Sequence, residues 1–176
     1  MVNLEELCKN ACEVKNQIGM LGCDSKNRVL MSAADMLLKQ EKEILEANAI
    51  DVENGKKNQM PEGLLDRLTL NHDRIQSMAD GLKQVAALDD PIGEVLSMKK
   101  RPNGLIIGKR RVPIGVIGII FEARPNVTSD AFGLCFKTGN CVILKGGSDA
   151  IHSNIAIVKA LKAALTMEGV PETALN

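Results

Sequence analysis

Two short apolar runs, each bounded by glycine or proline and followed by a polar loop, constrain the fold of this chain more than any other feature. Residues 116–121 are almost continuously apolar, and residues 141–144 repeat the pattern. Such runs are typical of strands buried on both faces, as in a parallel sheet. Residues 128–137 between them have helical spacing. The order strand, helix, strand therefore predicts a parallel βαβ unit with a right-handed crossover.

Helical periodicity dominates the first part of the chain. Apolar residues recur every three or four positions over residues 4–18 and again over residues 25–54, which predicts amphipathic helices. Asp24 or Ser25 could cap the second helical segment, because side-chain oxygens at this position accept the free amide hydrogens of a first turn.

The remaining helical segments are bounded by turn and cap residues. A polar loop is predicted over residues 54–63, and a third helix follows Asn71 and ends before Pro91, since proline disfavours helix in the residue before it. The last helix begins near Ile151 and closes at Gly169.

After Pro91 the periodicity changes to that of strands. Residues 94–100 and 105–112 flank the sequence Arg101-Pro102-Asn103-Gly104, in which proline presets the turn and glycine tolerates a positive φ. We therefore predict a β hairpin.

The last residues of the chain bear on whether the predicted parallel sheet is complete. Residues 170–176 lie where the next parallel strand is expected to begin, and two parallel strands are too few to bury both faces of a doubly wound sheet. We therefore expect an incomplete part of a larger fold. We also expect the edge of the strand at residues 141–144 to be exposed, and the isolated chain to fold poorly or associate.

Composition excludes several functional classes. The 22 basic residues balance 22 acidic ones, so a nucleic-acid or acidic-membrane partner is not expected. No apolar run approaches the ~20 residues of a membrane span, and the acidic start does not resemble a signal peptide, so we expect a cytoplasmic protein. The five cysteines lack the spacing of a disulfide framework or a metal site. We expect reduced thiols, with Cys135 and Cys141 in packing roles.

Candidate chemistry lies at the carboxyl ends of the two predicted parallel strands, where open α/β sheets bind ligands. Lys145 with Gly146 and Gly147 could approach a phosphate or ribose, although a solvated lysine explains the same residues. Asn126 offers an uncharged donor for an oxyanion, although an asparagine in a loop is more often a turn former or cap. Neither a dinucleotide-binding G-x-G-x-x-G after a strand nor a Walker motif occurs.

Longer motifs carry a resemblance to a known family. The segment at residues 113–128, PIGVIGIIFEARPNVT, resembles the signature of the γ-glutamyl phosphate reductases within the aldehyde dehydrogenase superfamily. So do KTGN with VILKGGS at residues 137–148, LDRL at residues 65–68 and DPIGE at residues 90–94.

The resemblance implies a fold class and a division of the chain. The fold is α/β and aldehyde dehydrogenase-like, with amino-terminal helices and an oligomerisation hairpin before the first half of a Rossmann-like parallel sheet. Residues 1–93 then form helices of the cofactor domain, residues 94–112 the hairpin, and residues 113–176 a truncated NADP-binding βαβα unit. None of these three parts is a catalytic domain, so we expect that domain to be absent from residues 1–176.

The resemblance also implies an activity and its residues. Members reduce L-glutamyl 5-phosphate with NADPH to L-glutamate 5-semialdehyde and phosphate, through a cysteine that no cysteine of this chain matches. NADP(H) is the implied cofactor, with Lys145, Gly146, Gly147 and Ser148 as its contacts. Ser148 leaves space for a 2′-phosphate where NAD-dependent relatives often have an acid.

Two site residues remain to be assigned under the resemblance. It makes Asn126 the oxyanion donor and Arg124 a contact for the substrate phosphate or carboxylate, although Arg124 could equally pin its loop. The resemblance also implies a small-molecule substrate and a homo-oligomeric full-length protein. The alternatives are a non-catalytic interaction module or pseudoenzyme, and the reductase part of a fused bifunctional synthase.

Overall fold

The structure is a computed structural model that describes residues 3–176. Its elements in chain order are α1 (Leu4–Gly19), α2 (Cys23–Lys39), α3 (Glu41–Lys57), α4 (Glu62–Leu68), α5 (His72–Ala87), β1 (Val95–Lys100), β2 (Ile106–Arg110), β3 (Val116–Ile120), α6 (Asn126–Lys137), β4 (Cys141–Lys145), the short 3-10 turn η1 (Ser148–Ala150), α7 (Ile151–Met167) and η2 (Glu172–Ala174). Within residues 3–176, none of the helices combines the length and the apolarity that a bilayer crossing needs.

β3 and β4 form the predicted parallel pair, in register from Val116 opposite Cys141 to Ile120 opposite Lys145. The last residues of the chain continue this sheet beyond β4. Leu175 forms a parallel bridge with Val142, and the Asn176 amide donates to the Val142 carbonyl at 3.0 Å. The expected exposed edge of β4 is therefore wrong, because a third segment already pairs with it.

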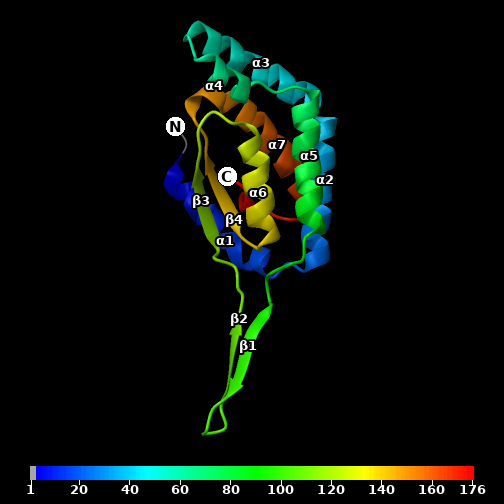
Figure 1. The fold of residues 1–176 in the computed structure, drawn as a ribbon, viewed down its shortest axis with the longest axis vertical. Coiled ribbons are helices and arrows are strands. Elements are labelled where there is room, and N and C mark those ends of the chain that lie inside the picture. Colours follow the sequence, from blue (N-terminus) through cyan, green and yellow to red (C-terminus); the bar gives the residue numbers. More distant parts are fainter. Residues whose placement is uncertain (1–2) are drawn as a thin grey trace.

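The sheet is less buried than its apolar strands predict. β4 begins fully buried at Cys141 and Val142, but β3 is half-exposed and Ile120 keeps 80% of its surface accessible. α6 lies on the near side of the strands in Figure 1 and α1 on the far side. The prediction that residues 116–121 are buried on both faces is wrong, because α1 and α6 pack mainly against β4 and leave much of β3 uncovered among the described residues.

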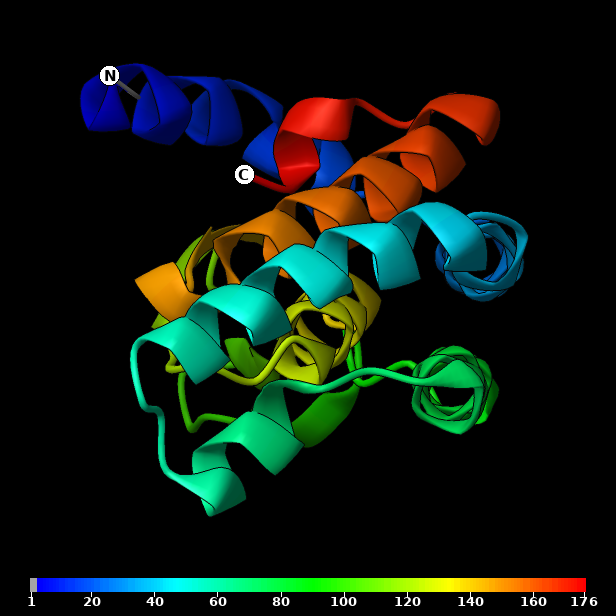
Figure 2. The ribbon, with the colours of Figure 1, turned by 90° about the horizontal axis from the view of Figure 1, so that it is seen from above.

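The amino-terminal helices and the βαβα unit share one core. α2 packs against α5 and α7, and Figure 2 shows α3 lying alongside α7. The core side chains that are entirely inaccessible come from both parts, among them Val29, Leu37, Phe132, Ile157 and Leu161. Helices from residues 3–93 thus provide the apolar surface against which the βαβα unit is stable.

The helices differ from the sequence prediction at three places. The predicted helix at residues 25–54 is two helices, with the chain turning at Gln40. Gly22 stands at the N-cap of α2 without a side-chain hydrogen bond, so the predicted capping by Asp24 or Ser25 is wrong. The predicted loop from Asn54 begins only after Lys57, and its last two residues already belong to the unpredicted helix α4.

The predicted hairpin is confirmed. β1 and β2 pair antiparallel, the Gly104 amide donates to the Arg101 carbonyl at 2.9 Å, and Gly104 has a φ of +88°. Figure 1 shows the hairpin extending away from the body of the molecule, and every residue of both strands is exposed.

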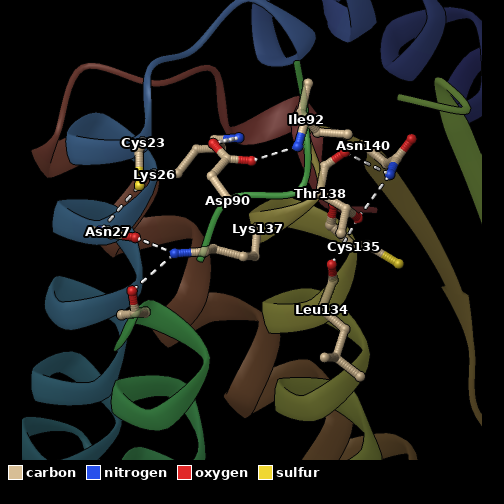
Figure 3. A network of polar contacts seen from close by, with 11 residues as sticks. Cys23, Lys26, Asn27, Asp90, Ile92, Leu134, Cys135, Lys137, Thr138 and Asn140 are labelled. Carbon is tan, nitrogen blue, oxygen red and sulfur yellow. Dashed lines mark hydrogen bonds and ion pairs between the residues drawn. The ribbon is translucent and has the colours of Figure 1, made fainter. Parts of the chain in front are cut away.

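A buried polar network holds the root of the hairpin (Figure 3). Lys26, only 1% exposed, forms an ion pair with Asp90, which also accepts a hydrogen bond from the Ile92 amide at 3.0 Å. The Lys137 ammonium donates to Asn27 Oδ1 at 2.7 Å and to the Ala86 carbonyl at 2.8 Å. The network joins α2, α5 and α6 directly before the chain enters β1.

Candidate functional site

The loops that follow β3 and β4 lie against each other at the carboxyl edge of the sheet. Glycine permits this packing at two positions. A Cβ atom on Gly146 would lie 2.2 Å from Nδ2 of Asn154, and one on Gly147 would lie 3.3 Å from the backbone of Glu122. Gly146 therefore allows the loop after β4 to pack against α7, and Gly147 allows it to pack against the loop after β3, whether or not a ligand also approaches them.

Buried polar side chains fix the helices behind these loops. Thr128 of α6 donates to Oδ1 of Asn154 of α7 at 3.0 Å. Asp51 of α3, 2% exposed, accepts the Ser153 amide at 2.7 Å and its hydroxyl at 2.6 Å, and contacts Nδ1 of His152 at 2.7 Å. Asp51 thus caps α7 from a different helix, which sets where the loop after β4 ends.

A pocket of about 430 Å³ lies between α4, α5 and the start of α6. Its floor includes Leu70 and Met78, both buried. Its polar lining contains two of the predicted site residues together with residues from α4, α5 and α6, namely Asp66, Arg67, Arg74, Arg124, Asn126 and Asp130. The structure therefore brings Arg124 and Asn126 into one cavity that carries three guanidinium groups.

One of the three arginines has a structural role. The Arg74 guanidinium donates to the backbone carbonyls of Asp66 and Thr69, the second at 2.6 Å, and lies 3.0 Å from the Asp66 carboxylate. It fixes the connection between α4 and α5. Within residues 3–176, the side chains of Arg67 and Arg124 make no hydrogen bond or ion pair, so both remain available to a ligand.

Asn126 is the first residue of α6 and is exposed. Its amide nitrogen lies 3.3 Å from Oδ2 of Asp130, one helical turn further on. A carboxylate accepts hydrogen bonds and does not donate them, so this contact orients the amide nitrogen toward Asp130. Burial raises the pKa of Asp130, although the hydrogen bond from Asn126 partly opposes that shift.

The predicted cofactor contacts lie apart from this pocket. Lys145 ends β4 and Ser148 begins η1, and both are exposed. Ser148 lines a second pocket of about 290 Å³ with His152 and Lys57 of α3. The structure thus places Arg124 and Asn126 in one cavity and Ser148 in another.

The cysteines of residues 3–176 are all free, and none lines either pocket. Burial raises the pKa of the Cys135 thiol, and burial together with the charge of Cys12 raises that of Cys141 to about 11. A protonated thiol is a poor nucleophile. Both buried cysteines therefore have the predicted packing role. Among residues 3–176, no three or more histidine, cysteine, aspartate or glutamate side chains lie close enough together to hold a metal ion.

Sequence reasoning missed several residues of the site. Arg67 lay inside a recognised motif without a role, and Asp130 lay on the predicted helix at an ordinary polar position. Asp51 interrupts an apolar helix face with a carboxylate, a pattern that signals a buried, satisfied polar group. No local signal joins Arg67 to Asn126, because α4 and the loop after β3 meet only in the folded chain.

Comparison with known proteins identifies the family that has this fold. A model of the aldehyde dehydrogenase family matches residues 2–176. The chain belongs to the aldehyde dehydrogenase family. Among curated aldehyde dehydrogenase relatives, it is 68% identical over 175 residues to the γ-glutamyl phosphate reductase of Agathobacter rectalis, covering 99% of this chain and 42% of that protein. The chain thus spans less than half of the length of such relatives.

Solved structures show the same fold. The γ-glutamyl phosphate reductase of Thermotoga maritima superposes with a TM-score of 0.97 at 43% identity, over 99% of this chain and 42% of that one. A glyceraldehyde-3-phosphate dehydrogenase from Methanocaldococcus jannaschii, complexed with NADP, superposes with a TM-score of 0.72 at 21% identity, over 98% and 35%. The predicted aldehyde dehydrogenase-like fold is confirmed.

The side-chain hydrogen-bond donors of the loop after β4 are of the kind that bind a pyridine nucleotide. The Lys145 ammonium and the Ser148 hydroxyl are exposed at the carboxyl end of a parallel strand and make no side-chain hydrogen bond within residues 3–176. Both can donate to phosphate or ribose oxygens. Nδ2 of Asn154 is buried without a partner behind the same loop, but it faces Gly146 and not the surface.

Proposed function

We propose that this chain is part of a γ-glutamyl phosphate reductase, which reduces L-glutamyl 5-phosphate with NADPH to L-glutamate 5-semialdehyde and phosphate in L-proline biosynthesis. The observation that carries the proposal is the pocket at the carboxyl end of β3, where Arg124, Asn126 and Arg67 line one cavity. The 68% identity to the Agathobacter rectalis reductase supports it.

The proposed substrate suits this cavity. An acyl phosphate carries a carbonyl that becomes an oxyanion when it is attacked, and a phosphate that leaves as a dianion. The Asn126 amide stabilises the developing oxyanion without competing for a proton. The Arg124 guanidinium, two residues earlier on the same loop, can pair with the departing phosphate.

NADPH supplies a hydride to the acyl carbon when it is bound. In the proposal, Lys145 and Ser148 hold its adenosine ribose and 2′-phosphate, and Gly146 and Gly147 keep the backbone of the loop open to it. A neutral Ser148 does not repel the 2′-phosphate, so NADPH is preferred to NADH.

We also propose that the hairpin joins two copies of the full-length protein. Its support is the row of exposed apolar side chains on both strands, which include Leu96, Met98, Ile106 and Ile107. Exposed apolar surface of this kind is typical of protein interfaces.

A chimera tests the activity directly. Residues 1–176 replace the corresponding segment of the Agathobacter rectalis enzyme, and phosphate-dependent oxidation of glutamate 5-semialdehyde by NADP⁺ is measured. We expect kcat/KM within about tenfold of the parent enzyme, because conserved site chemistry transfers with the segment. A folded chimera without turnover would contradict the proposed function.

A further inference from the structure

The two arginines without partners line the same pocket from different elements of the fold. Arg67 comes from α4, whereas Arg124 comes from the loop between β3 and α6. Arg124 lies beside Asn126, on the side of the reacting carbonyl in the proposed function. Arg67 lies on another element of the lining and, in the proposed function, remains free to contact a different part of the bound molecule.

The pocket also offers one carboxylate that no cation neutralises. The Asp66 carboxylate is already paired with Arg74 at 3.0 Å. Asp130 contacts only the neutral amide of Asn126 within residues 3–176, at 3.3 Å. Burial raises the pKa of the Asp130 carboxyl group, because burial destabilises its ionised form. A cation bound next to it would stabilise that ionised form.

A free guanidinium and a free carboxylate in one cavity favour a ligand with both charges. Guanidinium groups bind carboxylates through two parallel hydrogen bonds, and a carboxylate binds an ammonium group through a charge-assisted one. The cavity of about 430 Å³ holds a molecule of amino-acid size. Because Asp130 lies within hydrogen-bonding distance of Asn126, an ammonium held by Asp130 lies only a few bonds from a carbonyl held by Asn126.

We propose that this pocket recognises the zwitterionic head group of an α-amino acid, with Arg67 binding its carboxylate and Asp130 its ammonium group. The assignment rests on the proposed function for the reacting end of the substrate and extends it to the other end. Arg67 and Asp130 are then specificity residues that select a glutamyl group over simple acyl groups.

Three aldehydes separate the two contacts in the active chimera: glutamate 5-semialdehyde, 5-oxopentanoate, which lacks the ammonium group, and 4-aminobutanal, which lacks the carboxylate. Arg67→Gln is expected to lower kcat/KM at least tenfold for the two carboxylates and to leave 4-aminobutanal nearly unchanged. Asp130→Asn is expected to lower it for 5-oxopentanoate as well, because Asp130 also orients Asn126, but at least tenfold more for the two amines. Arg28→Gln and Asp35→Asn, exposed positions outside the pocket, are the matched controls.

The outcomes are distinct. Selective losses in the crossed pattern support the inference, whereas equal losses for all three aldehydes, or none, would overturn it while the proposed function stands. An inactive but folded chimera counts against the proposed function, and ligand binding to that chimera then decides the inference. L-glutamate is titrated against glutarate while the side-chain Nε–H signals of arginine are followed by NMR. A saturable shift of the Arg67 signal that is stronger with L-glutamate supports it, and an unshifted signal contradicts it.

Discussion

The contact between Asn126 and Asp130 gives the proposed oxyanion donor a defined orientation before substrate binds. Donors held in place cost no reorganisation during the reaction, which is why each one contributes strongly to turnover. Here a carboxylate one helical turn away holds the amide nitrogen in position, and the second N–H of the same nitrogen remains free for the substrate.

Asn126→Ala in the chimera is expected to lower kcat by about a hundredfold or more, the usual loss when an oxyanion donor is removed. Binding of NADP⁺, measured by fluorescence quenching or calorimetry, should be unchanged because Lys145 and Ser148 lie outside this pocket. Loss of cofactor binding with normal turnover at saturation would show that the role of Asn126 is misassigned.

Ser148→Glu tests the cofactor preference at the other loop. A carboxylate at this position would repel a 2′-phosphate and could accept the ribose hydroxyls of NADH, so kcat/KM for the NADP⁺ reaction should fall about tenfold or more relative to NAD⁺. Asp149→Glu is the matched control, because Asp149 is the neighbouring exposed residue and already carries the charge. Equal effects on both cofactors would argue against a 2′-phosphate contact.

Among the elements, α7 depends on a cap from outside its own sequence. Asp51→Ala would leave the Ser153 amide and hydroxyl without this acceptor, and buried groups of this kind cost about 1–3 kcal/mol each when unsatisfied. We expect the free energy of unfolding of the chain, from urea denaturation, to fall by about 2–4 kcal/mol. Asp149→Ala should change it by less than about 0.5 kcal/mol, as an exposed position does, and an equal effect of both changes would contradict the capping role.

The hairpin root is the element whose stability should depend on pH. Burial raises the pKa of Asp90, but hydrogen bonds from Lys26 and the Ile92 amide and the charges of Lys26 and Lys137 outweigh it, so the pKa lies below its ordinary 3.8. A lowered pKa in the folded state stabilises the fold above the unfolded value, and that contribution disappears as the pH falls through the folded value.

Asp90→Asn should therefore destabilise the chain at pH 7 by about 3 kcal/mol, since it leaves the buried Lys26 charge without its partner. The difference from the parent should shrink as the pH falls below 3.8. Urea unfolding at neutral and acidic pH measures both values, with Asp35→Asn on the exposed surface of α2 as the control. A difference that is independent of pH would exclude the ion pair as the cause.

At the scale of the whole molecule, two parts of the chain have opposite surface properties. The body, built from both ends of the sequence, encloses one core, whereas the hairpin extends from it with all of its strand residues exposed. A polar network with two buried lysines joins α2, α5 and α6 to the segment before the hairpin. Such a projecting arm is expected to act through contacts with another chain.

The chimera provides the test of this arm. Met98→Lys with Ile106→Lys places charges on its exposed apolar strands and should convert an oligomer to smaller species in sedimentation velocity, while circular dichroism shows an unchanged fold. Lys99→Met is the charge-removing control on the same strand. An unchanged oligomeric state would count against the proposed role of the hairpin.

The sequence alone determined the features that arise from short-range physics. The hairpin follows from its Pro102-Asn103-Gly104 turn, the parallel pair from two apolar runs separated by a helix, and α5 begins directly after Asn71 as predicted. These patterns depend on periodicity and local backbone preference, which neighbouring residues set. The resemblance of its motifs likewise identified the family that the comparisons confirm.

Only the tertiary structure decided which residues meet. The break at Gln40 and the extra helix α4 carry little local signal, and Arg67 of α4 lines one pocket with Asn126, 59 positions later in the chain. In the same way Asp51 caps α7 from α3, and Gly146 is needed because Asn154 lies behind it. Contacts between distant segments depend on how helices pack over the whole core, and a local pattern of residues contains no information on that packing.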